Sequence, residues 1–444
     1  MRTPQLLVLI AVLFLPAVAR ACPTLAPYYP IPGQTADWQS VDRALAPLLS
    51  ECLLSSEYFA LRGAAQLNTG QLTDALESLE RALLLEPENG AAQIDYALAL
   101  FESGQLFAAL EVNERLIERN DLPPGLAPAI RQRQSNWRDL TRDGEVQLDL
   151  LLGYDNNLNA APADEQLTLT LSGESILLTL NPEFQPVSGP YVNFRSAGRY
   201  RFLAPNHQHN FSASVRGRVS EDTKSDLLQF SARYNLLRPD QNNAWQLQTG
   251  VNQLFYGGSS LFTGSDLGLR YQPPGDEQCR PDFLAAVQFQ HFHGQAQLDA
   301  VETKLSAGGL CDFPAMFNAE GRQRVSFGLS LLRNDNLDGN RLGGDRRGWQ
   351  LNFDWQQPLG DGAIYAQLNH TRQRDGQPYS ALLSNNSIRR QNRSYMLLQY
   401  RKPAHFFGEN STLMINLYHQ YQQSNIDLFK IVDTTIEAGL SFRF

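Results

Sequence analysis

The chain has 444 residues, of which 42% are hydrophobic, 10% aromatic and 19% charged, and its formal net charge is -9. This hydrophobic content excludes a disordered chain, and the negative charge argues against nucleic acid as a partner. A helical membrane protein would carry several apolar stretches of about 20 residues. Only the N-terminus has such a stretch, and the length predicts two or three domains.

Residues 1–21 have the pattern of a secretory signal peptide. Arg2 precedes an apolar core over residues 6–18, and the segment ends in the small-x-small cleavage site 19–21. The alternative is a lipoprotein signal cleaved before Cys22, although Arg20 stands where such signals usually have a small uncharged residue. Either signal sends the chain out of the cytoplasm. Its four cysteines then meet an oxidising compartment, where an even number favours disulfides over metal or redox chemistry.

A helical repeat is predicted for residues 22–144. A shift of 34 residues aligns Thr69–Leu76 with Ser103–Leu110, and 34 is the period of the tetratricopeptide repeat. The first unit is regular and ends at Pro87, whereas the second is less regular. Terminal repeats tend to be atypical, so Val41–Leu54 is expected to form a partial or capping unit. A disulfide between Cys22 and Cys52 would hold the N-terminal arm against it.

Acidic residues are concentrated in this region. Residues 22–144 contain about 17 acidic and 9 basic side chains, against about 29 and 26 in residues 145–444. Stacked helix pairs present a concave surface, so we expect a docking site for a peptide or partner of basic character. The alternative is a rigid scaffold with a solvated acidic face.

Strict alternation of apolar and polar residues begins near residue 145. In residues 349–356, for example, Trp349, Leu351, Phe353 and Trp355 alternate with polar residues. The polar face is rich in Gln, Asn, Ser, Arg and Gly, which suits a water-filled lumen, and aromatic residues near strand ends suit interfacial girdles. About fourteen such strands can be counted over residues 145–444. The even number and the longer loops on one side, such as Gly153–Pro190 and Tyr256–Gly264, are typical of bacterial barrels.

The predicted fold class therefore combines N-terminal tetratricopeptide-type helical repeats with an antiparallel transmembrane β-barrel of about fourteen strands. The barrel would lie in the outer membrane of a Gram-negative bacterium, with the helical domain in the periplasm. The last residues alternate up to Leu440, Phe442 and Phe444, which resembles the signal by which the barrel-assembly machinery recognises its clients. Cys279 and Cys311 fall at the bases of the neighbouring seventh and eighth strands, so a disulfide between them is predicted.

Strong enzyme and cofactor motifs are absent from the sequence. It contains no Walker loop, no His-Glu-x-x-His, no Cys-x-x-Cys and no Gly-x-Ser-x-Gly. His291 and His293 share a strand face but are expected to be an interfacial or loop-proximal pair without a carboxylate nearby. Asn334–Asp345 is only weakly similar to a calcium loop, and His370 is expected on the lipid side. We therefore predict no catalytic residue, cofactor or metal site.

The segment Gly153-Tyr154-Asp155-Asn156-Asn157-Leu158-Asn159, at the junction of a periplasmic repeat domain with such a barrel, resembles the surface lipoprotein assembly modifier family. The resemblance implies a barrel that moves lipoproteins or related proteins to the cell surface, with repeats that handle the client or a chaperone. Only this segment, with Gly153, Tyr154, Asp155, Asn157 and Asn159, carries over residue by residue. A polysaccharide exporter of repeat-plus-barrel type and a passive porin with an accessory domain are the alternatives.

The loop that follows this segment contains two β-prone runs, Leu167–Leu171 and Ile176–Leu180, joined by Ser172–Ser175. They are expected to form a hairpin. Whether the hairpin projects from the surface or folds into the lumen as a plug stays open at this point.

Overall fold

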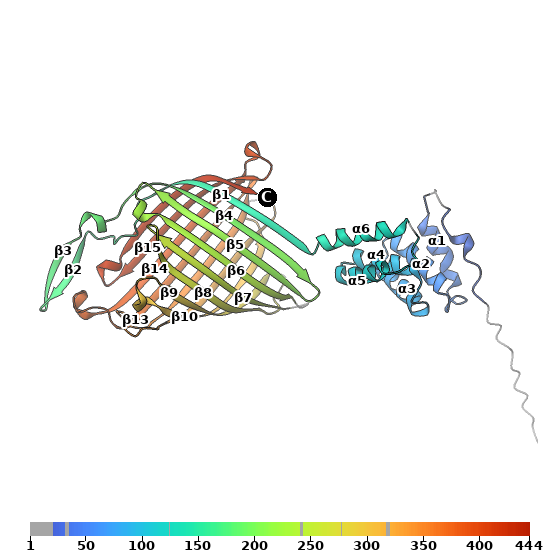
Figure 1. Ribbon diagram of the computed structural model, residues 1–444, viewed down its shortest axis with the longest axis horizontal. Helices are drawn as coiled ribbons and strands as arrows, with labels where there is room; N and C mark the ends of the chain where they lie inside the picture. The colour runs from blue at the N-terminus through green and yellow to red at the C-terminus, as the bar shows by residue number, and fades with distance from the viewer. Residues whose placement is uncertain (1–20, 32–34, 124, 240–242, 277, 317–319) are drawn as a thin grey trace, which may run out of the picture. The chain divides into compact units, whose positions relative to one another are not determined.

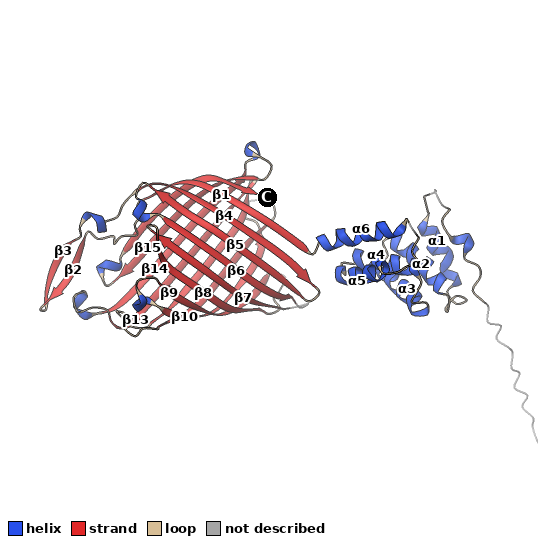
Figure 2. Cartoon of the chain, viewed as in Figure 1, coloured by secondary structure: helices blue, strands red, loops and turns tan. Residues whose placement is uncertain are grey.

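The computed structural model describes residues 21–444 except for 32–34, 124, 240–242, 277 and 317–319, so nearly all of the predicted signal peptide lies outside the described residues. The chain divides into two compact units, residues 1–140 and 141–444 (Figure 1). The division falls slightly before the predicted boundary at 144 because the first strand already begins at Arg142. Figure 2 shows that the first unit is helical and the second consists mainly of strands. None of the helices within the described ranges has the length and apolarity needed to cross a membrane.

The described residues of the helical unit form six α-helices, which confirms the predicted repeats. Corresponding signals recur with the repeat period: the side chains of Ser55 and Asn89 cap α2 and α4, and Gly70 and Gly104 follow these helices with φ of 77° and 81°. The helices are α1 (Trp38–Leu45), α2 (Ser56–Asn68), α3 (Leu72–Leu85), α4 (Gly90–Glu102), α5 (Leu106–Ile117) and α6 (Leu126–Asp139).

Small residues let the helices of a repeat approach closely. A Cβ on Gly63 of α2 would lie 2.5 Å from Cγ of Leu79, which is itself fully buried in α3. At the N-terminal end, Cys22 is joined to buried Cys52 with an S–S distance of 2.01 Å.

The second unit is a closed antiparallel barrel of fourteen strands, as predicted. Each strand pairs with its neighbours in chain order, and β1 pairs with β16 to close the barrel. The barrel strands are β1 (Arg142–Asp155), β4 (Gly189–Ala204), β5 (His207–Ser220), β6 (Leu227–Pro239), β7 (Ala244–Tyr256), β8 (Ser259–Gln272), β9 (Cys279–Phe292), β10 (Ala300–Pro314), β11 (Arg322–Asn336), β12 (Arg346–Leu359), β13 (Gly362–Pro378), β14 (Ile388–Pro403), β15 (Ser411–Ser424) and β16 (Ile431–Arg443).

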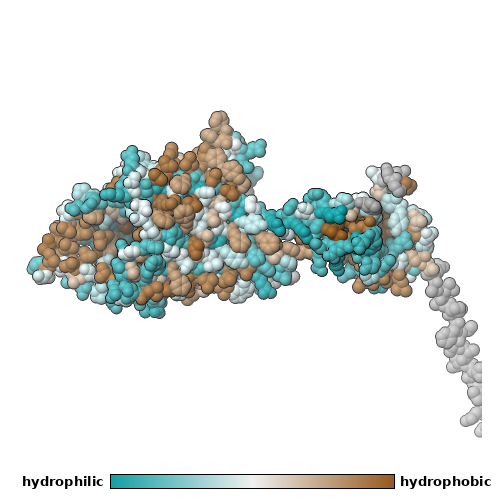
Figure 3. Space-filling model, in the orientation of Figure 1, coloured by the Kyte–Doolittle hydropathy of each residue, from teal (hydrophilic) through white to brown (hydrophobic). Residues whose placement is uncertain are grey.

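Side chains alternate between the lumen and the outer surface along each strand. In β1, Leu150 and Leu152 are exposed on the outside, whereas Asp149 and Leu151, which alternate with them, are buried on the lumen side. Figure 3 shows hydrophobic residues spread over the outer surface of the barrel. Apolar residues outside and polar residues inside are the arrangement of outer-membrane barrels.

Most short connections lie at the end where β1 begins, such as Pro205–Asn206 between β4 and β5. The prediction of a loop over Tyr256–Gly264 is wrong. β7 ends at Tyr256 and β8 begins at Ser259, so only Gly257 and Gly258 form the turn, both with positive φ. The strands are longer than expected because residues 259–263 continue the ladder with β7.

Cys279 and Cys311 face each other across β9 and β10 and form a disulfide with a Cα–Cα distance of 4.1 Å. In the loop between β1 and β4, β2 (Gln166–Leu171) and β3 (Glu174–Thr179) form a hairpin whose turn has positive φ at Ser172 and Gly173. Figure 1 shows the hairpin beyond the ends of the barrel strands and outside the lumen. It is therefore a surface hairpin rather than a plug.

Candidate functional site at the closing seam of the barrel

The closing seam is the pairing of β1 with β16, which runs from Gln147 and Arg443 to Asp155 and Thr435. The backbones of Val146 and Phe444 extend it, with hydrogen bonds of 2.9 and 3.0 Å in the two directions. The proposed assembly-signal residues belong to this seam. Leu440 pairs with Leu150 and Phe442 pairs with Leu148, so their side chains share the outward apolar face with those of β1.

Gly153 makes room for a side chain that crosses the seam. It lies between Tyr191 of β4 and Glu437 of β16, and the Tyr191 hydroxyl donates a 2.6 Å hydrogen bond to Glu437 Oε1. A Cβ at position 153 would lie 2.5 Å from Cζ of Tyr191. The glycine therefore serves the close approach of the tyrosine ring, and its φ is not positive.

Glu437 is the centre of a hydrogen-bond network over the lumen side of the seam. Its side chain is 2% exposed and also accepts bonds from Asn193 Nδ2 at 2.7 Å and Asn416 Nδ2 at 3.0 Å. Gln399 donates in turn to Asn416 at 2.7 Å. The network connects β4 with β16, β15 and β14, and it crosses β1 at Gly153, where no side chain stands in the way. A buried carboxylate with several donors of this kind is well satisfied, so the network stabilises the closed seam.

The rest of the predicted junction motif secures the end of the seam. Asp155 accepts a 2.7 Å hydrogen bond from the Asn157 backbone N–H. It also forms an ion pair with Arg218, whose Nη1 lies 2.9 Å from Asp155 Oδ2. Asn157 Nδ2 donates to the carbonyls of Ala161 and Val432. The Asp and Asn side chains thus turn the chain through local hydrogen bonds, which these residue types commonly form.

The last motif residues hold the start of the following loop. Asn159 donates to the carbonyl of Gln185 and accepts from the N–H of Val187. Tyr154, by contrast, points outward and is 50% exposed, which places it among the apolar side chains of the outer surface. Within the motif, therefore, Gly153, Asp155, Asn157 and Asn159 organise the seam and its loop, and Tyr154 faces the lipid side.

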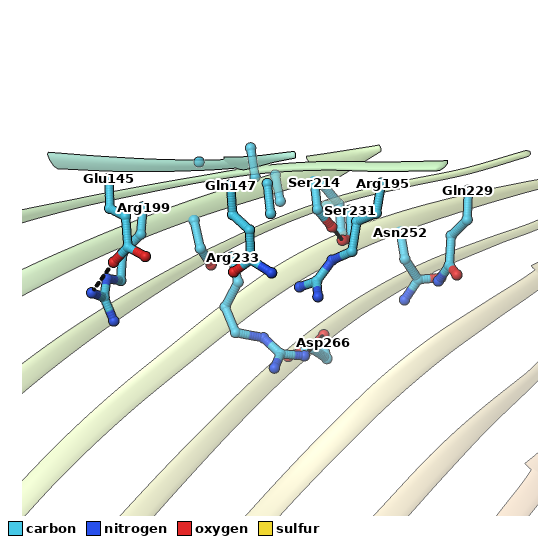
Figure 4. Close-up of a pocket in the computed structure, with 16 residues that line it drawn as sticks. Glu145, Gln147, Arg195, Arg199, Ser214, Gln229, Ser231, Arg233, Asn252 and Asp266 are labelled. Carbon is cyan, nitrogen blue, oxygen red and sulfur yellow. Dashed lines mark hydrogen bonds and ion pairs between the residues drawn. The ribbon is translucent and has the colours of Figure 1, made fainter. Parts of the chain in front are cut away.

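A polar hollow of about 510 Å³ lies beside the seam on the lumen wall (Figure 4). Figure 4 shows arginine, glutamine and asparagine side chains that extend from β1 and β4–β8 into this space. Arg199 Nη2 lies 2.7 Å from Glu145 Oε2, and Arg233 Nη2 lies 3.7 Å from Asp266 Oδ1. The wall therefore carries both signs of charge and is suited to hydrated, mixed-charge groups rather than to one apolar ligand.

The histidines that the sequence offered as weak metal and catalytic candidates have partners of their own. His291 does have a carboxylate nearby, contrary to prediction: its Nδ1 lies 2.7 Å from Asp299 Oδ2. This partner comes from the short connection to β10, which folds back over the strand end. His370 bonds to Ser394 Oγ at 2.9 Å on the outer face. Among the described residues, no three His, Cys, Asp or Glu side chains form a metal-binding group.

The calcium-like loop is organised by an arginine. Arg341 is 5% exposed and donates from Nη2 to the Asn334 carbonyl at 3.0 Å and from Nε to the Gly344 carbonyl at 2.8 Å. Arg341 Nη1 also donates to Asn334 Oδ1, the side-chain oxygen at the first position of the loop, which a bound Ca²⁺ would need as a ligand.

The acidic side chains of the helical unit are spread over both helices of each repeat. α3 carries Asp74, Glu77 and Glu80, and α5 carries Glu111 and Glu114. α2 and α4, the first helices of the two repeats, pack against each other. This contact places α2 and α4 on the inner curve of the stack. The inner helices carry Glu57, Asp95 and Glu102, so both helices of each pair contribute acidic side chains.

One acidic group of the inner helices is partly enclosed. Asp95 of α4 is largely surrounded by protein, and burial raises its pKa to about 6, although the charge of Arg133 in α6 opposes this shift. This carboxyl therefore titrates within the range of mildly acidic compartments.

Comparisons with known proteins identify the repeats of the first unit by family. Residues 67–127 match the tetratricopeptide repeat family. The Sgt2 tetratricopeptide domain of Aspergillus fumigatus is 22% identical, with 23% of this chain and 70% of that chain covered and a TM-score of 0.22. An anion-selective porin from Comamonas acidovorans is 10% identical over 68% of this chain and 99% of that chain, with a TM-score of 0.34.

The improved structure of Pseudomonas aeruginosa OprD is likewise 10% identical over 68% of this chain and 95% of that chain, with a TM-score of 0.33. No curated protein matches the chain. The barrel assignment rests on the closed strand order and the apolar outer face of this molecule.

The sequence motif led to half of the site. Tyr191, Glu437 and Arg218 were missed because each lies on a strand far along the chain from its partner, as in the 246-residue separation of Tyr191 and Glu437. One signal was available: Glu437 is a charged residue at a lumen-facing position of the last strand, where it requires a partner.

Proposed function

We propose that this protein is a non-enzymatic outer-membrane translocator that moves protein clients, surface lipoproteins above all, from the periplasm to the cell surface. The observation that carries the proposal is the direct covalent union of a helical repeat unit with a closed barrel. α6 ends at Asp139 and β1 begins at Arg142. Repeat units of this type bind peptides and proteins on their extended surfaces. In this proposal the repeats lie in the periplasm and dock the client or its chaperone.

The chemistry of the lumen favours a protein client over the two alternatives. A sugar exporter should line its lumen with charge of one sign and exposed aromatic residues, whereas this wall pairs arginines with carboxylates. A protein segment presents both signs of charge, so a mixed wall neither repels nor traps it. A passive porin needs no protein-binding unit, and the repeats would then be without a role.

The test is a comparison of surface-exposed proteins in cells with and without this chain. Intact cells are treated with protease, and the surface and total proteomes are quantified. We expect one or a few lipoproteins to be lost from the surface while their total amount is retained, and wild-type chain to restore them. An unchanged protein surface with altered exopolysaccharide or solute uptake would contradict the proposal and favour the exporter or the porin.

A pair of variants assigns the role of the repeats. Leu79→Asp places a charge in the core of the helical unit, whereas Leu84→Asp changes an exposed leucine of the same helix. We expect the first variant to fail to restore surface display and the second to restore it. Both should keep a folded barrel, which is checked by its mobility on a gel before and after heating.

A further inference from the structure

The β2–β3 hairpin has one open edge. β2 is paired on one side with β3, and on its other side Leu169 bridges to Leu383 and the Thr170 N–H donates to the Leu382 carbonyl at 2.9 Å. The Thr168 N–H donates to Asp427 Oδ2. Both edges of β2 are therefore occupied, and only β3 is available for further pairing. Figure 1 shows β3 as the outer strand of the pair, beyond the end of the barrel.

The register identifies which backbone groups of β3 point outward. The Leu180 N–H donates to the Glu165 carbonyl, so this pair is hydrogen-bonded. In an antiparallel ladder the next residue points the other way, which turns the backbone groups of Ser175, Leu177 and Thr179 away from β2. Within the described parts of the chain, these three residues have no backbone partner on that side.

This edge lacks the features that normally prevent strand pairing. Edges are usually protected by proline, lysine, a bulge or a covering loop. β3 instead exposes Ile176, Leu177 and Leu178, at 46%, 66% and 47% respectively. Figure 3 shows hydrophobic residues at this end of the molecule. Their exposure outside the membrane-spanning strands indicates a binding surface rather than a lipid-facing one.

Charge restricts the chemistry of the partner. Residues 160–190 contain Asp164, Glu165, Glu174 and Glu183 and no lysine or arginine. Lys430, from the connection between β15 and β16, neutralises Asp164 at 2.8 Å. The remaining carboxylates flank the apolar edge at both ends of the hairpin. An extended apolar segment with basic residues on its flanks is therefore complementary to β3 in backbone, side chains and charge.

We propose that the open edge of β3 receives such a segment of the translocated client, which adds a strand to the hairpin as it emerges at the cell surface. This inference rests on the proposed function and names the contact that the client makes on leaving the barrel. Backbone hydrogen bonds provide the affinity in this mode of recognition, so clients of different sequence are accepted.

The test separates backbone pairing from apolar contact at one residue. Leu177→Pro removes an outward N–H without touching a bond to β2, because proline is tolerated on an edge strand. Leu177→Ala retains the N–H and shortens the side chain. In cells that lack the native chain, we expect Leu177→Pro to reduce surface display of the clients identified above by roughly tenfold, the effect of losing about 1.4 kcal/mol of binding. Leu177→Ala should reduce it much less.

A photo-reactive benzoylphenylalanine at position 177 provides a direct readout. It should form an adduct with a client identified by the display assay, and the same probe at position 170, on the occupied edge, should not. Equal surface display by Leu177→Pro and wild type would overturn the inference. The proposed function would still stand in that case, provided that cells without the chain lose surface display. An adduct only with a second copy of this chain would also overturn it.

Discussion

The helical unit and the barrel place apolar and polar residues in opposite ways. In the helical unit Leu79 is fully buried and the charged residues of α3 face water. In the barrel Glu437 and Asn416 are buried on the inside, and Leu152 is 68% exposed on the outside. Each unit turns its apolar side chains toward its own apolar surroundings, which are protein for one and lipid for the other. Burial values alone would therefore give the wrong picture of which barrel residues are stabilising.

The two units also depend on different interactions. The helical unit is stabilised by close packing, so its core is sensitive to volume. The barrel has no packed apolar interior, and its closed ladder of backbone bonds satisfies the groups that lipid cannot. A substitution that shortens a buried side chain should therefore lower the stability of the helical unit strongly, and lower that of the barrel much less at a similarly buried position.

The largest effect is expected for a cavity in the helical core. Leu79→Ala should lower the free energy of unfolding of the helical unit by about 2–5 kcal/mol, because it removes buried contacts and leaves a void. The loss of circular dichroism at 222 nm on heating the full chain in detergent follows this unit. Leu84→Ala, at a 73% exposed position of the same helix, is the matched control and should melt as wild type does.

A second pair of substitutions examines the barrel, where an arginine should be tolerated on one face only. Leu247 of β7 is exposed on the outside, and Gln248 next to it faces the lumen. Leu247→Arg should cost up to about 2–4 kcal/mol in lipid, whereas Gln248→Arg should cost little. Reversible unfolding in lipid vesicles measures both. Equal costs would mean that the assignment of faces is wrong.

A third prediction concerns the hydrogen bond between Tyr191 and Glu437, which lie on the two strands that flank β1. Gly153→Ala places a methyl group against the Tyr191 ring and should separate its hydroxyl from Glu437, at a cost of about 1–3 kcal/mol. The measurement is the temperature at which the folded barrel loses its compact gel mobility. Gly198→Ala is the control, because a Cβ there meets nothing within 4 Å. A wild-type transition for Gly153→Ala would exclude the proposed role of the glycine.

The smallest effect is a pH dependence confined to the helical unit. Burial raises the pKa of Asp95 to about 6, so the folded state holds its proton more tightly than the unfolded state. The resulting stability is complete below the ordinary aspartate pKa and is lost as the pH rises through about 6. Asp95→Asn should flatten thermal stability over this range. An unchanged slope in the variant would assign the effect to other groups.

The repeats and the alternation of apolar and polar residues made the architecture predictable. They did not predict which residues of neighbouring strands pair with each other. The spacing of 34 residues and the alternation from residue 145 were sufficient for the helical repeats and the fourteen strands. The Gly257–Gly258 turn was missed because β-prone residues on both sides of a glycine pair fit either a loop or a continuous strand.

The site shows the same limit. The short motif from Gly153 to Asn159 is visible in sequence because its Asp and Asn side chains act locally. Its partners depend on which residues of β4 and β16 lie opposite β1, and a shift of one residue would turn Glu437 toward lipid. Sequence alternation does not fix that shift.

The link between the two units has a kinetic consequence. Only Leu140 and Thr141 separate the last helix from the first strand, and two residues span at most about 7 Å. If the repeats hold a client as proposed, that client is tethered to the barrel, and its transfer becomes an intramolecular event at an effective concentration on the order of millimolar. Transfer would then proceed at a rate independent of how dilute the client is in the surrounding compartment, once the repeats are occupied.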